Sequence, residues 1–309
     1  MNILITGIHG FVGNNLVDAL KANHTIYGLD IISPHKEGVI RTFNWDELSE
    51  LPGIDTVIHL AGKAHDTKNK SEEKVYFDIN TGLTQKIYDW FNTSPAKKFI
   101  FFSSVKAAAD TVNSDILTED VIPAPKGPYG ESKIAAENYI LKHMTKDKGV
   151  YILRPAMIHG PGNKGNLNLL HSIIKKGLPY PLGKFENKRS FTSIANVSFV
   201  VNQLIDKNIP SGIYNIADDE TLSTNELISL IGNVMNKRSK IWNWNPAFIL
   251  FIAKAGTFIH FPLNTDRLQK LTENYVVSNQ KIKTALNIEK MPVTAKEGFT
   301  KTILSFEEK

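Results

Sequence analysis

The sequence predicts an α/β fold built on a doubly wound parallel sheet, and three observations carry the prediction. An apolar strand at Asn2–Thr6 runs directly into three glycines separated by two residues each, Gly7, Gly10 and Gly13. Short apolar runs then alternate with helical patterns through the first half of the chain, as expected of strands buried on both faces. Asp30 ends the second apolar run.

The spacing of the glycines suits a turn that approaches a pyrophosphate. One glycine permits the sharp turn, one lets the backbone approach the phosphates, and one lets the helix pack closely on the strand. The N–H groups and positive dipole end at the start of the next helix would bind the phosphates. Asp30 stands about where an acid that accepts the ribose hydroxyls is expected. The sequence therefore predicts a dinucleotide-binding site.

The expected elements follow the chain in a regular order up to about residue 160. Strands are expected at Asn2–Thr6, Thr25–Asp30, Val39–Phe43, Thr56–Leu60, Lys98–Ser103 and Val150–Leu153. Helices are expected near Phe11–Ala22, Val75–Asn92, Tyr129–Met144, Leu167–Lys176, Asn196–Lys207, Thr224–Met235 and Ser278–Leu286. We expect a nucleotide-binding domain over residues 1–160 and mainly a smaller substrate-binding region over 161–309, with about 189–216 returning to the sheet.

Composition narrows the function. The chain has 309 residues, 36 basic and 31 acidic, and no cysteine, which excludes disulfides, thiolate catalysis and cysteine-bound metals. The basic residues are scattered, which favours an anionic small ligand over a nucleic acid. A first strand beginning at residue 2 leaves no room for a signal peptide, so a cytoplasmic protein is expected.

One apolar stretch, Ala247 to Ile259, is interrupted by Lys254 and followed by Pro262. It is too short to cross a bilayer. A buried or lid helix is the expectation, and a membrane-surface contact stays open.

Tyr129 and Lys133 are four residues apart, so on a helix they share one face. An ammonium near the phenol would lower the tyrosine pKa from about 10, and such a phenol can exchange a proton with a substrate hydroxyl. The spacing alone also arises by chance, as at Tyr180 and Lys184, although Pro181 between that pair argues against a helix.

Ser103 and Ser104 end the apolar strand Phe99–Phe102, at the sheet edge where ligands bind. A hydroxyl there could polarise a substrate oxygen. The same serines could also simply cap the strand as turn residues.

Taken in order, these motifs resemble the extended short-chain dehydrogenase/reductase family, specifically its nucleotide-sugar epimerases, reductases and dehydratases, whose nucleotide-binding part is a Rossmann-type sheet. The resemblance covers nearly the whole chain. It rests on Thr6-Gly7-x-x-Gly10-x-x-Gly13, His59-Leu60-Ala61-Gly62, Asn80-Thr81-Gly82-Leu83-Thr84, Phe99 to Ser104, Tyr129-x-x-x-Lys133, and Leu153-Arg154-Pro155 followed by Gly160-Pro161-Gly162.

The resemblance implies a role for each of these positions. Tyr129 would be the acid/base, Lys133 would hold the nicotinamide ribose and depress the tyrosine pKa, and Ser104 would orient the sugar 4-oxygen. NAD is implied as the cofactor because the charge of Asp30 would repel a 2′-phosphate, while His35 and Lys36 leave NADP open. The implied cofactor-binding residues are Gly7, Gly10, Phe11, Val12, Gly13, Asp30, Leu60, Ala61, Gly62, Tyr129 and Lys133.

On the substrate side, Asn163 and Asn166 resemble contacts to uridine diphosphate, and Arg189 resembles the arginine on the diphosphate, where guanidinium geometry suits phosphate. The alternatives are a glycine-rich turn that tolerates asparagine and a solvated strand arginine. His59 and Asn80 are expected to be structural supports. No histidine shows metal-ligand spacing, so no metal is expected.

Some positions depart from the family pattern. Asn44 stands where an adenine-contacting Asp is common. Val105-Lys106 replaces the Asp-Glu pair of sugar dehydratases, and Ala107 to Ala109 replaces the Val-Tyr-Gly of many epimerases. The Ser-Ser-Val-Lys run looks more like members that act on N-acetylated or 6-deoxy sugars in bacterial polysaccharide pathways.

The implied function is a 4-epimerase of a UDP-hexose or UDP-N-acetylhexosamine that works through a transient 4-keto intermediate. The alternative is an NAD(P)H-dependent reductase of a UDP-4-keto-6-deoxy sugar. A non-catalytic NAD-binding protein on the same fold is disfavoured by the Ser/Tyr/Lys set. The family also implies a homodimer through the helices at Val75–Asn92 and Tyr129–Met144.

Overall fold

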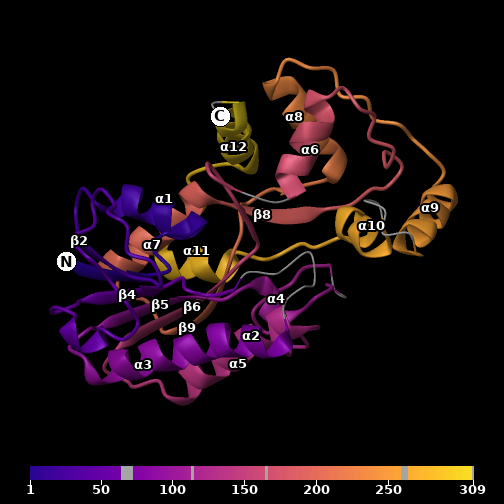
Figure 1. The fold of residues 1–309 in the computed structure, drawn as a ribbon. Coiled ribbons are helices and arrows are strands. Elements are labelled where there is room, and N and C mark those ends of the chain that lie inside the picture. The colour runs from indigo at the N-terminus through magenta and orange to yellow at the C-terminus, as the bar shows by residue number, and fades with distance from the viewer. Residues whose placement is uncertain (64–71, 113–114, 164–165, 259–263, 308–309) are drawn as a thin grey trace.

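Seven parallel strands form the larger sheet in the order β3-β2-β1-β4-β5-β6-β9. The computed structural model describes residues 1–63, 72–112, 115–163, 166–258 and 264–307 (Figure 1). The strands are β1 (Asn2–Thr6), β2 (Thr25–Leu29), β3 (Thr42–Phe43), β4 (Thr56–His59), β5 (Lys98–Phe102), β6 (Gly149–Pro155) and β9 (Gly212–Ile216). The strand order reverses between β1 and β4, which is where open α/β sheets bind their ligands.

Helices cover both faces of this sheet because successive strand residues point to opposite sides. Ile3 and Ile5 of β1 pack under α1 (Phe11–Leu20), α7 (Ile194–Asp206) and α11 (Gln280–Leu286). Leu4 faces the other layer, which contains α2 (Glu73–Tyr76), α3 (Leu83–Thr93) and α5 (Pro128–Lys142). Figure 1 shows the two layers above and below the sheet.

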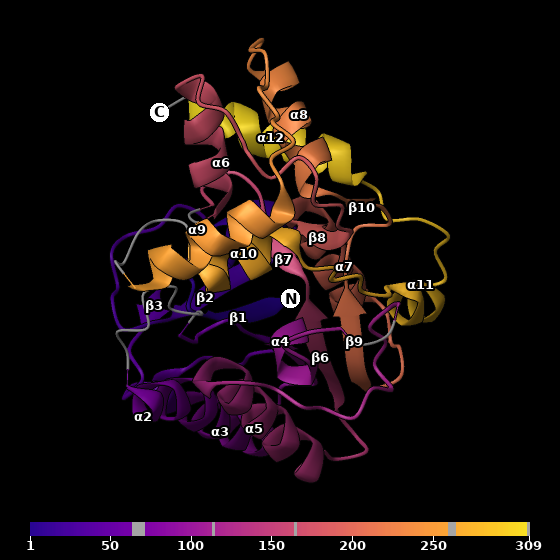
Figure 2. The same cartoon turned by 90° about the vertical axis from the view of Figure 1, so that its right-hand side faces the viewer.

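A smaller sheet has the strand order β10-β8-β7. A single residue, Ala156, separates β6 from β7 (Met157–His159), so the small sheet lies beyond the carboxyl end of β6 (Figure 2). Its other strands are β8 (Arg189–Ser193) and β10 (Thr221–Leu222), and its helices are α6 (Asn166–Lys175), α8 (Thr224–Val234), α9 (Pro246–Phe258), α10 (Thr265–Thr272) and α12 (Ala295–Glu307). They share a separate apolar core that includes Leu170, Leu227, Ile231 and Phe299.

The predicted α/β fold with its Rossmann-type sheet is confirmed, with differences in three places. The predicted strand Val39–Phe43 is reduced to Thr42–Phe43, because Ile40 is 69% exposed and the segment runs along the sheet edge. The helix predicted at Val75–Asn92 divides into α2, a π-helical segment at Phe77–Gly82, and α3. The strands of the small sheet and the helices α4 (Val105–Ala108), α10 and α12 were not predicted. β9 was not predicted as a strand either, although about 189–216 was expected to return to the sheet.

The division into domains at residue 160 stays a prediction. Within residues 189–216, β8 belongs to the small sheet, whereas α7 and β9 belong to the large one. Among the described residues, no helix is both long and apolar enough to pass through a membrane.

Candidate active site

The loop after β1 is shaped by its glycines. Gly7 has a φ of +66°, and a Cβ there would lie 2.9 Å from the backbone of Ala61. A Cβ at Gly13 would lie 2.6 Å from the Ile8 carbonyl oxygen. The first glycine therefore lets two loops meet, and the last lets α1 start directly against the turn. Gly10 is the N-cap residue of α1, and the next two residues, Phe11 and Val12, form its first turn.

Asp30 lies beside this loop at the end of β2. Its Oδ2 accepts a hydrogen bond of 3.1 Å from the backbone N–H of His9, and its Oδ1 accepts one of 2.8 Å from Ile31. The acid therefore already holds the glycine loop, at the place where the ribose contact was expected. Lys36, one of the two residues that left NADP open, donates to Asn14 of α1.

The loop after β4 packs against the same turn. The Ala61 N–H donates to the Thr6 hydroxyl over 3.0 Å, and the Leu60 N–H donates to the Thr6 carbonyl over 3.2 Å. A Cβ at Gly62 would lie 2.9 Å from Asn80 Oδ1 and 3.2 Å from Lys133 Nζ. This loop thus connects the glycine turn to the helix that carries Lys133.

Ser104 and Tyr129 are brought together from two elements. Ser104 is the N-cap of the short helix α4, where its hydroxyl accepts from the Lys106 N–H over 3.2 Å. Tyr129 is in the first turn of α5, and its phenol and the Ser104 hydroxyl are hydrogen-bonded. The Tyr76 ring stands edge-on to the Tyr129 ring, with centroids 6.5 Å apart.

The pKa of Tyr129 differs from the expected one. Burial raises it, and the hydrogen bond with Ser104 lowers it by a smaller amount. In the chain on its own the pKa of Tyr129 therefore lies above its ordinary value, because removing the phenol from water disfavours its charged form more strongly than the Ser104 hydrogen bond favours it. The lowering of this pKa by Lys133 stays a prediction.

Lys133 lies one turn further along α5 and is 5% exposed. Its ammonium donates to the Phe102 carbonyl over 2.9 Å, at the end of β5. Burial lowers the lysine pKa to about 8, and the negative charge of Glu137 opposes that shift. The amine is therefore held at the carboxyl end of the strand that leads to Ser104.

Ser103, the alternative to Ser104, has a different partner. Its hydroxyl donates to Glu137 of α5. The same carboxylate accepts from Arg154 Nε over 3.0 Å, and both charged side chains are almost fully buried. The Ser103 hydroxyl is therefore bonded to the buried Glu137–Arg154 ion pair. Ser104 is the serine that bonds to Tyr129.

Among the described residues, Asn80 and His59 bond to groups that hold the fold together. Asn80 lies in the π-helical segment and donates to the Ser132 hydroxyl over 2.9 Å, while its Oδ1 accepts from the Lys63 N–H over 2.7 Å. His59 is hydrogen-bonded to two buried hydroxyls, Thr6 and Thr84. Burial lowers its pKa to about 3, so it stays neutral.

The predicted substrate loop lies against α1. Asn15 of α1 donates to the Pro161 carbonyl over 3.4 Å, and the Phe11 ring lies 3.9 Å from the Cβ that a side chain at Gly162 would have. The Asn163 N–H closes the turn onto the Gly160 carbonyl over 3.1 Å. Asn166 is the first residue of α6, and its side chain lies outside the described part of the structure.

Arg189 opens onto a pocket in the smaller region. The side chains that line this pocket with it are Met157, Leu167, Leu170, Phe191, Thr224, Leu227 and Leu271. The guanidinium carbon lies 5.9 Å from the centroid of the Phe191 ring. Burial lowers the arginine pKa, and the charge of Glu273 opposes this. Since a guanidinium keeps its charge, the pocket presents a cation among apolar side chains.

Tyr275 connects this pocket to the serine, and sequence reasoning missed it. It pairs with Arg189 in an isolated β-bridge, and its hydroxyl donates to the Ala109 carbonyl over 2.6 Å. Lys106 lies 4.5 Å from the centroid of its ring. No motif marks this tyrosine, because its contacts come from residues far away in the sequence.

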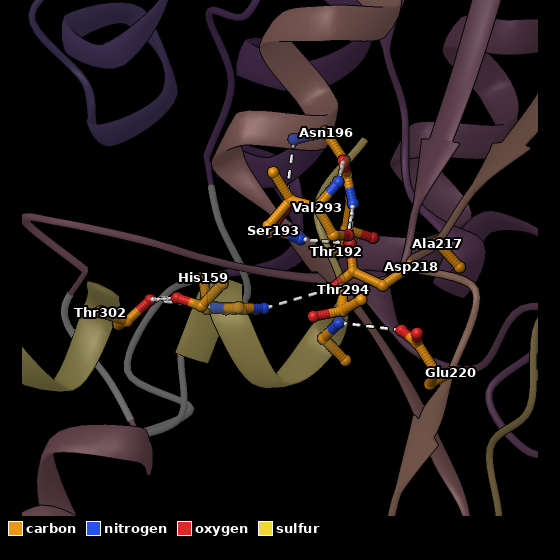
Figure 3. A network of polar contacts seen from close by, with 12 residues as sticks. His159, Thr192, Ser193, Asn196, Ala217, Asp218, Glu220, Val293, Thr294 and Thr302 are labelled. Carbon is orange, nitrogen blue, oxygen red and sulfur yellow. Dashed lines mark hydrogen bonds and ion pairs between the residues drawn. The ribbon is translucent and has the colours of Figure 1, made fainter. Parts of the chain in front are cut away.

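The two sheets are joined by a buried polar network, seen close up in Figure 3. Asp218, just after β9, accepts from the Ser193 N–H over 2.9 Å and from Asn196 Nδ2 over 2.7 Å. His159 of β7 lies between Asp218 and Thr302, with its Nδ1 3.0 Å from the Thr302 hydroxyl. Within the described residues, no group of three or more histidine and acidic side chains could hold a metal.

The chain is similar to known proteins along most of its length. The sequence pattern of the NAD dependent epimerase/dehydratase family matches residues 3–217. A UDP-glucose 4-epimerase of Vibrio cholerae is 31% identical over 99% of this chain and 95% of its own length. An N-acetyl-alpha-D-glucosaminyl-diphospho-ditrans,octacis-undecaprenol 4-epimerase of Escherichia coli O157:H7 is 29% identical over 91% of this chain and 84% of its own length.

A reductase is also among the relatives. A GDP-6-deoxy-D-mannose reductase of Pseudomonas aeruginosa is 27% identical over 75% of this chain and 79% of its own length. The solved UDP-glucuronic acid 4-epimerase from Bacillus cereus, in complex with NAD, superposes with a TM-score of 0.77 at 20% identity, over 100% of this chain and 99% of that one. On the matched pattern and the full-length similarity, the chain belongs to the NAD dependent epimerase/dehydratase family.

Proposed function

We propose that this chain is an NAD-dependent 4-epimerase of a nucleotide sugar, either a UDP-hexose or a UDP-N-acetylhexosamine, acting through a transient 4-keto sugar. The observation that carries the proposal is the hydrogen bond between Ser104 and Tyr129, next to a lysine held by the end of the same strand. The V. cholerae and E. coli relatives, both named 4-epimerases, support it.

The glycine loop fits NAD. Any side chain at Gly7 or Gly13 would collide with backbone atoms, so these glycines set a tight turn directly before α1. The N–H groups at the start of α1 would bind the pyrophosphate there. Asp30 beside the loop would accept the adenosine ribose hydroxyls, and Lys133 would donate to the nicotinamide ribose. When bound, NAD would supply the acceptor and donor of the hydride at C4 of the sugar.

The protein's own groups handle the proton. Tyr129 takes the proton of the 4-hydroxyl and later returns it, and Ser104 holds the sugar oxygen at hydrogen-bond distance from the phenol. Because burial raises the tyrosine pKa, the phenol is a proton donor at rest. Its work as a base depends on donors that stabilise the phenolate, of which the Ser104 hydroxyl is one.

The substrate side is proposed from charge and position. Arg189 would bind the diphosphate in two hydrogen bonds, since its planar fork matches phosphate oxygens. Asn163 and Asn166 would contact the uridine portion from the loop that packs on α1. Tyr275, through Ala109 and Lys106, would keep this pocket aligned with Ser104.

The second candidate is an NAD(P)H-dependent reductase of a UDP-4-keto-6-deoxy sugar. The Pseudomonas aeruginosa relative is named a reductase, and Val105-Lys106 stands after the serine in place of a dehydratase pair. A reductase would use the same serine, tyrosine and lysine. The two candidates differ in whether the cofactor is consumed.

The test is a proton NMR time course of UDP-N-acetylglucosamine with the purified chain and trace NAD, without a reductant. Growth of the C4 epimer is expected. No conversion, together with NADH consumption on a 4-keto-6-deoxy sugar nucleotide, would replace the epimerase with the reductase. The same assay with a lipid-diphosphate sugar asks whether the carrier must be UDP, because the E. coli relative is named for such a substrate.

Tyr129→Phe should lower turnover by about 10²–10⁴-fold while nucleotide binding by calorimetry is retained. The matched control is Tyr139→Phe, further along the same helix, where the hydroxyl donates to Asp89 over 2.6 Å. A fully active Tyr129→Phe variant would remove the assignment.

A homodimer through α3 and α5 is a further proposal, tested by light scattering.

A further inference from the structure

Helix α9 is apolar on two opposite sides. Ile249 and Ala253, one turn apart, are fully buried and pack with Leu268 of α10 in the core of the smaller region. The other side exposes Phe248 (53%), Leu250 (46%) and Phe251 (69%). We call these three side chains the α9 face. A helix that is apolar all round is typical of complete burial or of contact with lipid.

Two tryptophans extend the α9 face. The rings of Trp242 and Trp244 stack with centroids 5.9 Å apart, and the Trp244 ring lies 5.7 Å from that of Phe248. The backbone of Trp242 is fixed by hydrogen bonds to Tyr180 (2.8 Å) and from Gly183 (3.0 Å). Trp242 is 46% exposed and Trp244 is 37% exposed. Tryptophans are enriched where a membrane surface meets water, since the ring is apolar and its N–H is polar.

Along the sequence, the stretch that contains α9 carries charges of one sign. No acidic residue stands in the sequence between Glu226 and Asp266. The same stretch contains four basic residues, Lys237, Arg238, Lys240 and Lys254. Lys254 is exposed on α9 itself. An apolar face that carries Lys254 and follows a basic stretch of the chain complements an anionic lipid surface, where each Lys or Arg near the surface adds to binding.

The geometry limits how α9 could meet a bilayer. The helix has 13 residues, so its length is about 20 Å, shorter than the ~30 Å hydrocarbon core. Its buried side is also committed to the protein core. It can therefore lie in the interface plane but cannot cross. Figure 1 shows α9 at the outer edge of the molecule, away from the larger sheet.

We propose that the α9 face, with Trp242 and Trp244, docks onto the surface of an anionic lipid bilayer. The docking would hold the Arg189 pocket close to the membrane, because α10 packs on α9 and its Leu271 lines that pocket. The proposal stands on exposure and charge and does not depend on which reaction the site performs.

The test uses the full chain and phosphatidylcholine vesicles, with and without phosphatidylglycerol, in a flotation assay. Binding is expected with phosphatidylglycerol, weaker at high salt, and accompanied by a blue shift of tryptophan emission. The double variant Phe248→Ser/Phe251→Ser should bind at least about tenfold more weakly, since two exposed phenyl rings no longer leave water. Lys240→Gln and Arg238→Gln should reduce the preference for the anionic lipid.

The matched control is Ile122→Ser, which removes an apolar side chain that is 87% exposed elsewhere on the surface. It should bind as the unchanged chain does, and Phe251→Ser alone serves if circular dichroism shows that the double variant is misfolded. Absence of vesicle binding by the unchanged chain would overturn the proposal. So would a dimer that the double variant dissociates without lipid, because the face would then be an interface between copies.

Discussion

Glu137 and Arg154 form a buried ion pair, and both side chains are at most 1% exposed. A single substitution in this pair should therefore lower the free energy of unfolding strongly. Glu137→Gln would leave the arginine charge buried without its partner, and the free energy of unfolding should fall by about 3–5 kcal/mol. Because Glu137 also raises the pKa of Lys133, its loss should lower that pKa further below about 8. Urea denaturation measures the first effect.

The lower pKa of Lys133 in Glu137→Gln should move the alkaline limb of the pH–rate profile to lower pH, because the lysine then loses its charge at a lower pH. A merely structural carboxylate would leave that limb in place. Glu289→Gln, at an exposed position, is the control and should change neither quantity. Unchanged stability in Glu137→Gln would contradict the assignment of a buried charge pair.

His59 should make the free energy of unfolding depend on pH below about 6.5. Its pKa is lowered to about 3 by burial, against 6.5 for an exposed histidine. As pH falls below 6.5, the unfolded chain binds a proton that the folded chain refuses, so stability should decline by up to about 1.4 kcal/mol per pH unit until about pH 3. Urea denaturation on both sides of pH 6.5 measures this slope.

His59→Gln should make that slope shallower, whereas His35→Gln, on the surface, should leave it as it is. An unaltered acid slope in His59→Gln would mean that other groups cause the acid sensitivity. Burial is the main cause of the low pKa, and the positive charge of Lys133 adds to it. The hydrogen bonds of His59 also fit a neutral ring. Thr84 donates its only hydroxyl proton to the Asn80 carbonyl over 2.6 Å, so it accepts from His59 Nε2, and Nδ1 accepts from Thr6.

At the scale of elements, the first turn of α1 lies so close to the glycine turn that no side chain fits at Gly13. Gly13→Ala would place a Cβ 2.6 Å from the Ile8 carbonyl oxygen and 2.7 Å from that of Gly7. The helix must move, so we expect a stability loss of about 1–3 kcal/mol and at least about tenfold weaker NAD binding. Calorimetric titration and thermal unfolding measure the two.

Gly53→Ala is the matched control, because a Cβ there has nothing within 4 Å. It should leave NAD binding unchanged. Wild-type affinity in Gly13→Ala would mean that the phosphates do not lie on this turn.

Features encoded within one element were accessible from sequence, and features made between distant elements were not. The glycine turn and the Tyr129/Lys133 pair depend on spacings within a few residues, so they could be predicted. Tyr275 and the partner of Arg154 come from distant positions, which no local pattern shows. The strands of the small sheet were missed because none is a continuous apolar run; the longest, Arg189–Ser193, contains a single apolar residue, Phe191.

At the scale of the whole molecule, the two halves of the sequence are interleaved. β9 is the edge strand of the larger sheet and pairs with β6, while α7 and α11 cover one of its faces. A fragment of residues 1–160 would leave apolar side chains such as Ile100 and Leu153 without the cover of Val200 and Val201. We expect this fragment to lack a cooperative unfolding transition and the full chain to show a single one by calorimetry.

The hydrogen bonds of Asp218 should make the two sheets of the full chain unfold together in one thermal transition. Asp218→Ala removes the acceptor of the Ser193 N–H and of Asn196 Nδ2, which also donates to the Val293 carbonyl over 2.7 Å. Buried donors without acceptors cost about 1–3 kcal/mol each. The region around β8 and α12 should therefore loosen first, giving a second, lower transition in calorimetry and faster hydrogen exchange in α12.

The control for this variant is Asp206→Ala, an exposed acid at the end of α7, which should keep one transition at the original temperature. A uniform drop in melting temperature with a single transition would show that Asp218 stabilises the chain as one unit rather than holding two sheets together. The split is the expected result, because His159 and Thr302 reach the larger sheet through the same carboxylate. Once it is gone, the stack of His159 on Phe299, with centroids 3.7 Å apart, stays with the smaller region.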